Sequence, residues 1–214
     1  MGQSGGTLRI VALLLVWALV ACTGEGKSAP APAAQASPVC TEAGICVGER
    51  FVAFYTRHGP LIGDPISPPS LHQGREVQYF EAGRLEYVAE YPQSYAVGLA
   101  YLGEELCGRQ PPLHYRSVPS SLDPDARYYR ETGHSLRSDM RRFVERNGGV
   151  GVFGPPISEP RTVGEATVQD FVRVQVRCSV EGECYLAPLG RLLLNGGELP
   201  GDLCPSIPAD DPDA

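Results

Sequence analysis

The chain has little of the side-chain chemistry on which most catalytic sites depend. Lys27 is its only lysine, Trp17 is its only tryptophan, and its four histidines occur singly along the chain. After residue 21 there is no GxSxG, HExxH or phosphate-loop motif, and no CxxC or paired-histidine spacing that would hold a metal ion. These absences disfavour a hydrolase and Schiff-base chemistry, because both need an activated nucleophile. The sequence therefore predicts a protein that is not an enzyme and has no catalytic residue, no metal site and no cofactor.

Basic residues are also scarce relative to acidic ones. The chain holds 18 Lys and Arg against 25 Asp and Glu, a net charge of −7 at pH 7. Affinity for nucleic acid depends on neutralising phosphates with basic side chains. We therefore expect no nucleic-acid partner. The content of 43% hydrophobic and 20% charged residues is that of a folded globular protein.

Residues 1–21 contain the parts of a secretory signal in the usual order. Arg9 precedes the apolar run IVALLLVWALV, which is too short to span a bilayer comfortably, and the small residue Ala21 comes directly before Cys22. The stretch LVAC at 19–22 resembles the lipobox of bacterial lipoproteins. This resemblance implies that Cys22 is the lipid attachment site and holds the chain outside the cytoplasm, on the outer face of the cell membrane, or on the outer membrane of a cell with two membranes. The alternative is an ordinary core cysteine after a buried helix.

Six cysteines remain after the one in the lipobox, and an even number is typical of an exported protein with disulfides. Six cysteines allow fifteen connectivities. The segment SVEGE can reverse the chain and bring together the cysteines on either side of it, a second pair has the same spacing, and the last two then tie the middle of the chain to its tail. The predicted disulfides are Cys178 with Cys184, Cys40 with Cys46, and Cys107 with Cys204.

One stretch of sequence occurs twice. GDPISPP at 63–69 returns as GPPISEP at 154–160, and EAGICVGERFVAFYTRHG at 42–59 lies over ETGHSLRSDMRRFVERNG at 131–148. In both copies of the longer segment, apolar residues recur at helical spacing, which predicts a helix of about three turns ended by glycine. The apolar positions are Val47, Phe51, Phe54 and Tyr55 in the first copy, and Leu136, Met140, Phe143 and Val144 in the second.

Two further segments complete each copy. EVQYFEAGRLEY at 76–87 and TVQDFVRVQVRC at 167–178 are rich in β-branched and aromatic residues around a turn, so each predicts a β-hairpin, and a Leu-Gly pair closes each copy. The predicted fold class is α+β, with two tandem units of a short helix, a Gly/Pro loop and a hairpin, joined by disulfides. The predicted organisation is a signal peptide at 1–21, a disordered Pro- and Ala-rich tether at 22–39, a first repeat at 40–107, a linker at 108–126, a second repeat at 127–195 and a mostly disordered tail at 196–214.

The motifs FGPPISEP at 153–160 and Val-Gln-x-Phe in each hairpin give the two copies a likeness to a known repeat. The chain resembles exported bacterial proteins with LGFP-type repeats, and ETGH at 131–134 is similar to the repeat units of Chloroflexi-type surface proteins. The first copy departs from that pattern, since Ile45 replaces the histidine and Pro60 replaces the second glycine. The resemblance implies attachment to the cell envelope.

Candidate ligand-binding residues lie in and after the hairpins. Tyrosine combines ring area with a hydroxyl, which suits a hydroxylated polymer, although the same residues could pack the hairpin. A glutamine at the same place in both copies could present its amide to a ligand or bond the backbone. The candidates are Gln78, Tyr79, Tyr87, Tyr91, Tyr95 and Gln169. The predicted function is non-catalytic association with envelope polysaccharide or peptidoglycan, and the alternative is a scaffold that binds another envelope protein.

Overall fold

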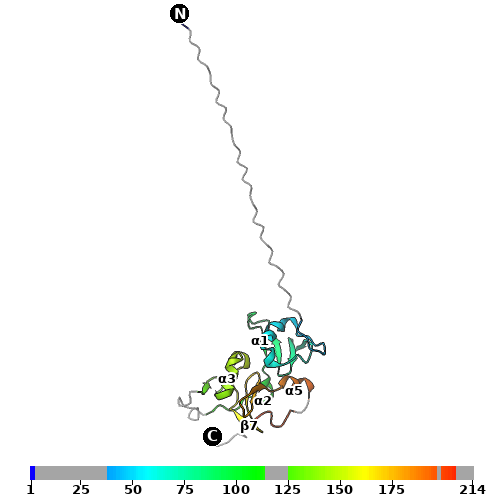
Figure 1. The fold of residues 1–214 in the computed structure, drawn as a ribbon, viewed down its shortest axis with the longest axis vertical. Helices are drawn as coiled ribbons and strands as arrows, with labels where there is room; N and C mark the ends of the chain where they lie inside the picture. Colours follow the sequence, from blue (N-terminus) through cyan, green and yellow to red (C-terminus); the bar gives the residue numbers. More distant parts are fainter. Residues whose placement is uncertain (3–37, 114–124, 197–198, 206–214) are drawn as a thin grey trace. The chain divides into compact units, whose positions relative to one another are not determined.

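Two four-stranded antiparallel sheets form the framework of the chain (Figure 1). The computed structural model describes residues 1–2, 38–113, 125–196 and 199–205, so Cys22 and the predicted signal peptide beyond Gly2 lie outside the described residues. Strand order is β1-β2-β3-β4 in the first sheet and β10-β9-β8-β7 in the second. The strands are β1 (Ser70–His72), β2 (Arg75–Phe80), β3 (Gly83–Tyr87), β4 (Val97–Leu99), β7 (Arg161–Val163), β8 (Ala166–Asp170), β9 (Gln175–Cys178) and β10 (Cys184–Leu186), and β5 (Arg127–Tyr129) pairs with β6 (His134–Leu136).

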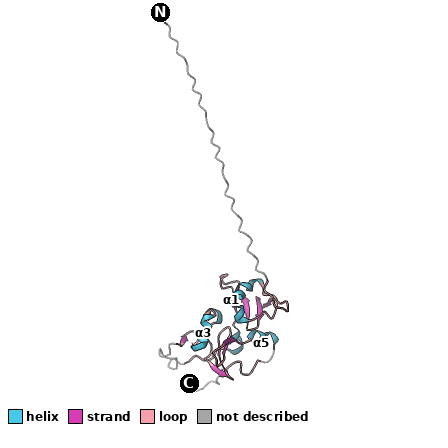
Figure 2. Cartoon of the chain, viewed as in Figure 1, coloured by secondary structure: helices cyan, strands magenta, loops and turns pink. Residues whose placement is uncertain are grey.

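The predicted hairpins are present at the centre of both sheets. β2 pairs with β3 from Glu76 opposite Tyr87 to Phe80 opposite Gly83. β8 pairs with β9 in the same way, starting from Thr167 opposite Cys178. Helices accompany both sheets (Figure 2), so the α+β class with antiparallel sheets is confirmed. The helical elements are η1 (Glu49–Phe51), α1 (Val52–Ile62), α2 (Leu102–Cys107), α3 (Ser138–Arg146), α4 (Gly149–Phe153) and α5 (Leu189–Asn195).

The predicted end of the first helix is wrong. α1 runs through Gly59 and Pro60 and ends at Ile62, whose side chain is fully buried. Proline fixes φ near the helical value, so the chain can continue for the half turn that carries Ile62 into the core. Gly63, at φ 76°, ends the helix in a positive-φ conformation that glycine adopts without a Cβ penalty. In the second copy Gly148, at φ 105°, does separate α3 from α4 as predicted.

The predicted starts of the helices are also wrong, because each helix begins after its first apolar residue. Val47 lies before η1, and its N–H donates to the carbonyl of Val39 at 2.8 Å. Leu136 lies in β6 opposite Arg127. Both side chains are nevertheless buried, so their apolar character reflects the core and not a helical face.

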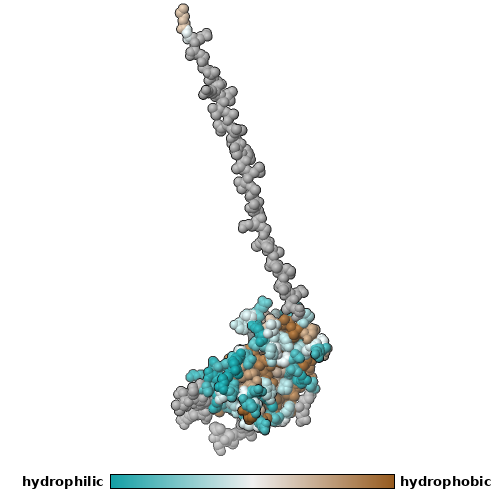
Figure 3. Space-filling view, in the orientation of Figure 1, coloured by the Kyte–Doolittle hydropathy of each residue, from teal (hydrophilic) through white to brown (hydrophobic). Residues whose placement is uncertain are grey.

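One large core joins the two halves of the described chain. Its largest buried side chains are phenylalanines, each of which contributes about 1.5–3 kcal/mol on burial. Phe153 meets Phe143 and Phe171 edge to face, with centroids 5.9 and 6.0 Å apart, and Phe80 stacks on Tyr55 at 5.4 Å. In the space-filling view, hydrophilic residues gather over α3, and more hydrophobic residues are also visible on the same face of the folded part (Figure 3).

The two Leu-Gly helices each pack on the opposite sheet. α2 follows the first sheet in sequence, yet Gly103 lies so close to the second hairpin that an added Cβ would be 1.9 Å from the carbonyl oxygen of Phe171. α5 follows the second sheet, and a Cβ at Gly190 would be 2.0 Å from the carbonyl oxygen of Phe80. Backbone hydrogen bonds from the residue after each glycine also join each helix to the sheet of the other half. The N–H of Glu104 donates to the carbonyl of Val172 at 3.0 Å, and the N–H of Arg191 donates to the carbonyl of Glu81 at 3.1 Å.

The six cysteines form three disulfides with the predicted pairing: Cys40–Cys46, Cys107–Cys204 and Cys178–Cys184. The long-range bond holds part of the predicted tail against the body. Leu203 is 1% exposed, and its carbonyl oxygen accepts a bond from Gln175 at 2.6 Å. The part of the predicted tail around Leu203 and Cys204 is therefore held against the body, while 206–214 lie outside the described residues.

Candidate functional site

A groove runs beside the tyrosine-rich segment that follows β3. It has a volume of about 730 Å³, and Tyr91, Tyr95 and Tyr101 line it. All three are exposed, and Tyr95 reaches 75% exposure. Arg57 of α1 and Arg173 of the β8–β9 turn line the same groove, so both halves of the chain contribute to it. The structure thus leaves two of the predicted tyrosines, Tyr91 and Tyr95, free of core packing.

The other two predicted tyrosines are committed to contacts within the protein. Tyr87 is half-buried and lies under the guanidinium of Arg50, 4.3 Å from the ring centroid. It borders an adjoining cavity of about 450 Å³ that also contains Tyr91. Tyr79 is half-buried, and its hydroxyl accepts a hydrogen bond from Arg84 at 3.4 Å. Both rings are therefore engaged in contacts within the protein, and neither is among the described residues that line the groove.

Charged groups line the groove next to the tyrosines. Arg84 is 5% exposed, and its Nη2 donates to Glu86 at 2.8 Å and to Glu105 at 3.1 Å. This arginine is fully paired, so it fixes the local structure and carries no unbalanced charge. Such a buried cation without carboxylate partners would be strongly destabilising.

Two arginines in the groove have no carboxylate partner among the described residues. Arg57 donates through Nε to the carbonyl of Ala53 at 3.2 Å, and Arg173 donates through Nη1 to the carbonyl of Gly151 at 2.9 Å. Burial lowers the pKa of the neighbouring His58 below its ordinary value, and the positive charge of Arg57 adds to the effect. The groove therefore offers aromatic faces together with guanidinium donors.

The matched glutamines are structural. Gln78 and Gln169 are both fully buried. Each amide nitrogen donates to two backbone carbonyls at 2.7–2.9 Å, those of Cys46 and Ser67 for Gln78 and those of Ser135 and Ser158 for Gln169. Of the two roles considered for these residues, the structure shows the backbone bonds, and it leaves neither amide on a ligand-accessible surface.

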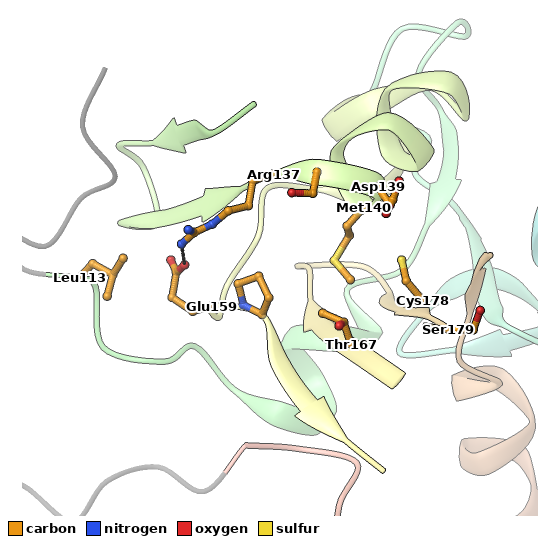
Figure 4. A pocket seen from close by; sticks show the side chains of 10 residues that line it. Leu113, Arg137, Asp139, Met140, Glu159, Thr167, Cys178 and Ser179 are labelled. Carbon is orange, nitrogen blue, oxygen red and sulfur yellow. Dashed lines mark ion pairs between the residues drawn. The ribbon is translucent and has the colours of Figure 1, made fainter. Parts of the chain in front are cut away.

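A second cavity, which the sequence analysis missed, lies where α3 begins. Its volume is about 600 Å³. Figure 4 shows the side chains of Arg137 and Glu159 directed toward each other on one side of it, with Met140 and Thr167 on the other. The lining residues are Leu113, Arg137, Ser138, Asp139, Met140, Glu159, Pro160, Thr167, Cys178 and Ser179.

The buried imidazole of His134 and the backbone N–H of Ser135 both lie next to the carboxylate of Glu159. The Oε1 atom of Glu159 accepts the backbone N–H of Ser135 at 2.8 Å, and Nδ1 of His134 lies 3.5 Å from the same oxygen. His134 is 1% exposed, and its Nε2 lies 3.2 Å from the carbonyl oxygen of Gln110. Glu159 Oε2 and Arg137 Nε are buried and have no hydrogen-bond partner among the residues that the structure describes. The ETGH motif and the acid in GPPISEP were the sequence signals for this cluster.

Among residues 38–113, 125–196 and 199–205, no three or more His, Cys, Asp or Glu side chains gather in a way that could hold a metal ion. Within the same part of the chain no helix is long and apolar enough to cross a membrane. No known family model matches the chain, and no curated protein matches it significantly.

Proposed function

We propose that the chain is a bacterial lipoprotein, anchored through Cys22, that presents two interlocked LGFP-like repeats and associates with envelope polysaccharide or peptidoglycan without catalysing a reaction. The observation that carries the binding role is the groove in which Tyr91, Tyr95 and Tyr101 are exposed together beside guanidinium groups. Exposed rings supply contact area at low entropic cost, and the hydroxyl and guanidinium groups supply hydrogen bonds to sugar hydroxyls.

Matching hydrogen bonds support the repeat assignment. In both halves the loop isoleucine donates its N–H to the hairpin, and the following serine hydroxyl accepts an N–H from the same hairpin residue. These bonds are Ile66 N to Tyr79 O at 2.9 Å and Tyr79 N to Ser67 Oγ at 3.1 Å, and in the second half Ile157 N to Asp170 O at 2.8 Å and Asp170 N to Ser158 Oγ at 3.0 Å. The buried glutamines make the third matching contact.

The disulfides support placement outside the cytoplasm, where such bonds persist. All six cysteines after Cys22 are paired. An acylated Cys22 followed by a tether would leave the folded part free to reach the envelope polymer.

A sedimentation assay tests the proposal. The complete chain in mild detergent is mixed with the insoluble envelope fraction of the source bacterium, before and after protein has been stripped from that fraction. Saturable binding that survives stripping supports a glycan ligand. Binding that is lost on stripping supports instead a scaffold for another envelope protein, and no binding in either case contradicts an envelope-associated role for the folded part.

A further inference from the structure

We propose that the cavity at the start of α3 is a second ligand site, and that it recognises the N-acetyl group of an amino sugar. The inference rests on the proposed function in one respect, namely that the envelope ligand is a glycan. The inference goes beyond that function because it assigns recognition of the N-acetyl group to a site separate from the tyrosine groove. The argument depends on the cavity, on the ion pair that lines it, and on a comparison with the same place in the first repeat.

Among the described residues, the place that corresponds to the cavity in the first repeat is occupied by side chains. The residue that corresponds to Arg137 is Gly48, and Pro69 packs against it so closely that a Cβ at Gly48 would be 2.6 Å from the ring of Pro69. Beside them Arg50 pairs with Glu76 at 2.7 Å and covers the ring of Tyr87 at 4.3 Å. These side chains fill the space.

In the second repeat, smaller or differently placed groups stand at the corresponding positions. Asp139 replaces the arginine, Thr167 replaces its carboxylate partner, and Cys178 replaces the tyrosine. Asp139 forms an ion pair with Arg142 along its own helix and not across the sheet. The result is an opening of about 600 Å³, which lies in the range of small-molecule sites.

Polar residues occupy several positions around the cavity where the first repeat has apolar ones. His134 and Glu159 stand where the first repeat has Ile45 and Pro68. Ser138, at the edge of the cavity, has a left-handed backbone at φ 55° without being glycine. A conformation of this kind costs of order 1–3 kcal/mol and gathers at functional sites. Packing alone does not require a buried histidine, a carboxylate and a strained serine at one place.

The ion pair leaves hydrogen-bonding capacity of both signs. Arg137 Nη2 is 3.5 Å from Glu159 Oε2, an ion pair without a hydrogen bond between its members. The guanidinium makes no hydrogen bond to any described residue, and Glu159 is bonded through Oε1 alone, to the N–H of Ser135. A donor and an acceptor side by side complement a secondary amide, whose carbonyl accepts and whose N–H donates. Because the two charges compensate each other, a singly charged ligand would be attracted by one and repelled by the other.

The rest of the cavity suits the acyl methyl group. Leu113, Met140, Pro160 and the Cys178 disulfide give it an apolar wall, while Thr167 and Ser179 hydroxyls can reach sugar hydroxyls. Small-molecule sites combine an apolar lining with few polar groups in this way. An N-acetylated amino sugar carries both features next to each other.

Calorimetric titration of the complete chain in detergent tests this site with two soluble sugars. Triacetylchitotriose carries an N-acetyl group on every ring, and cellotriose has a hydroxyl at the same positions. We expect saturable binding of triacetylchitotriose and at least tenfold weaker binding of cellotriose. Arg137→Met, which removes the guanidinium, and Thr167→Trp, which fills the cavity, should each weaken triacetylchitotriose binding at least tenfold. Glu165→Trp, in the exposed turn before β8, is the matched control and should bind as the wild type does.

Three results would overturn the inference. Equal binding of both sugars would show that the amide is not recognised, while leaving a glycan-binding role intact. Binding that survives Arg137→Met and Thr167→Trp in folded protein, as checked by circular dichroism, would place the site elsewhere. If the chain bound neither sugar but still sedimented with stripped envelope, N-acetyl recognition would be contradicted and the proposed function would stand. If the sedimentation were lost as well, both the inference and the proposed function would be contradicted.

Discussion

Gly190 of α5 lies directly against the carbonyl oxygen of Phe80, a residue 110 positions earlier in the chain, and an added Cβ would come within 2.0 Å of that oxygen. Gly103 has the reciprocal contact with Phe171. Each half of the chain therefore supplies the helix that covers the hairpin of the other half. We therefore expect the two halves to unfold together, because each hairpin packs against a helix from the other half.

Gly190→Ala should destabilise the protein by about 1–3 kcal/mol, because the methyl group forces the helix away from the hairpin backbone. Chemical denaturation monitored by circular dichroism measures the change. Gly151→Ala is the matched control: Gly151 is helical and has open space around its Cβ position, so alanine there should be neutral or stabilising by about 0.5–1 kcal/mol. Equal midpoints for the two variants would contradict the close approach.

The Cys107–Cys204 disulfide should contribute more stability than the short ones. It closes a separation of 97 residues, whereas Cys40–Cys46 and Cys178–Cys184 each close 6. Loop-closure entropy predicts a loss of about 4–5 kcal/mol when the long bond is removed by a double alanine substitution, against about 2 kcal/mol for a short one. Unfolding of the variants under non-reducing conditions checks the order, and a larger loss for Cys40–Cys46 would contradict it.

Gln78→Leu should destabilise the fold strongly. The change leaves the carbonyls of Cys46 and Ser67 and the N–H of Gly48 without the partner they have now, and each unsatisfied buried group costs about 1–3 kcal/mol. Gln93→Leu, at an exposed position, is the control and should change the midpoint little. A folded Gln78→Leu protein of normal stability that had lost only ligand binding would show that the residue serves the ligand and not the fold.

His58 should titrate below pH 6.5, its ordinary pKa, because burial and the charge of Arg57 both disfavour the imidazolium. Between the lowered pKa and about 6.5 the unfolded chain binds more protons than the folded chain. The stability that depends on His58 is therefore complete above about pH 6.5 and is lost as the pH falls toward the folded pKa. An NMR titration of the imidazole measures the midpoint, and Arg57→Gln should raise it; a wild-type midpoint above 6.5 would contradict the burial argument.

Lipidation of Cys22 remains a prediction from the sequence. The complete chain, expressed in a bacterial host with labelled palmitate, should incorporate the label and fractionate with membranes. Cys22→Ser should lose the label, because the thiol is the acceptor. The Cys40→Ala and Cys46→Ala double variant is the control for the loss of cysteine and should retain the label.

Local patterns were sufficient to predict the hairpins and the two short disulfides, and the long-range disulfide followed as the remaining pair. The alternation in 76–87 and the turn between Cys178 and Cys184 are properties of short segments, and the structure has both. The helix ends were mispredicted where tertiary contacts decided them. Pro60 continues a helix because Ile62 has a place in the core, and Leu136 is a strand residue because Arg127 lies opposite it.

The reciprocal packing and the second cavity depend on contacts that sequence spacing does not define. The sequence analysis recognised the Leu-Gly pairs only as the close of each copy, and nothing in the sequence said that Gly103 would meet Phe171 and not the hairpin of its own half. Glu159 and His134 are likewise 25 positions apart and converge only through the loop and the strand that carry them. The sequence also did not predict which tyrosines are exposed. Tyr87 and Tyr95 belong to the same tyrosine-rich segment, yet Tyr87 is half-buried and Tyr95 is exposed.

The tyrosine groove is the central claim, and the most direct test measures binding to stripped envelope material as a function of protein concentration. The Tyr91→Ala and Tyr95→Ala double variant should bind about tenfold more weakly, because each ring contributes about 0.5–1.5 kcal/mol and tenfold corresponds to about 1.4 kcal/mol. Tyr185→Ala, which removes an exposed tyrosine on β10 outside the groove, should bind as the wild type does. Unchanged affinity of the folded double variant would contradict the account, and would show that the groove is not where the envelope polymer binds.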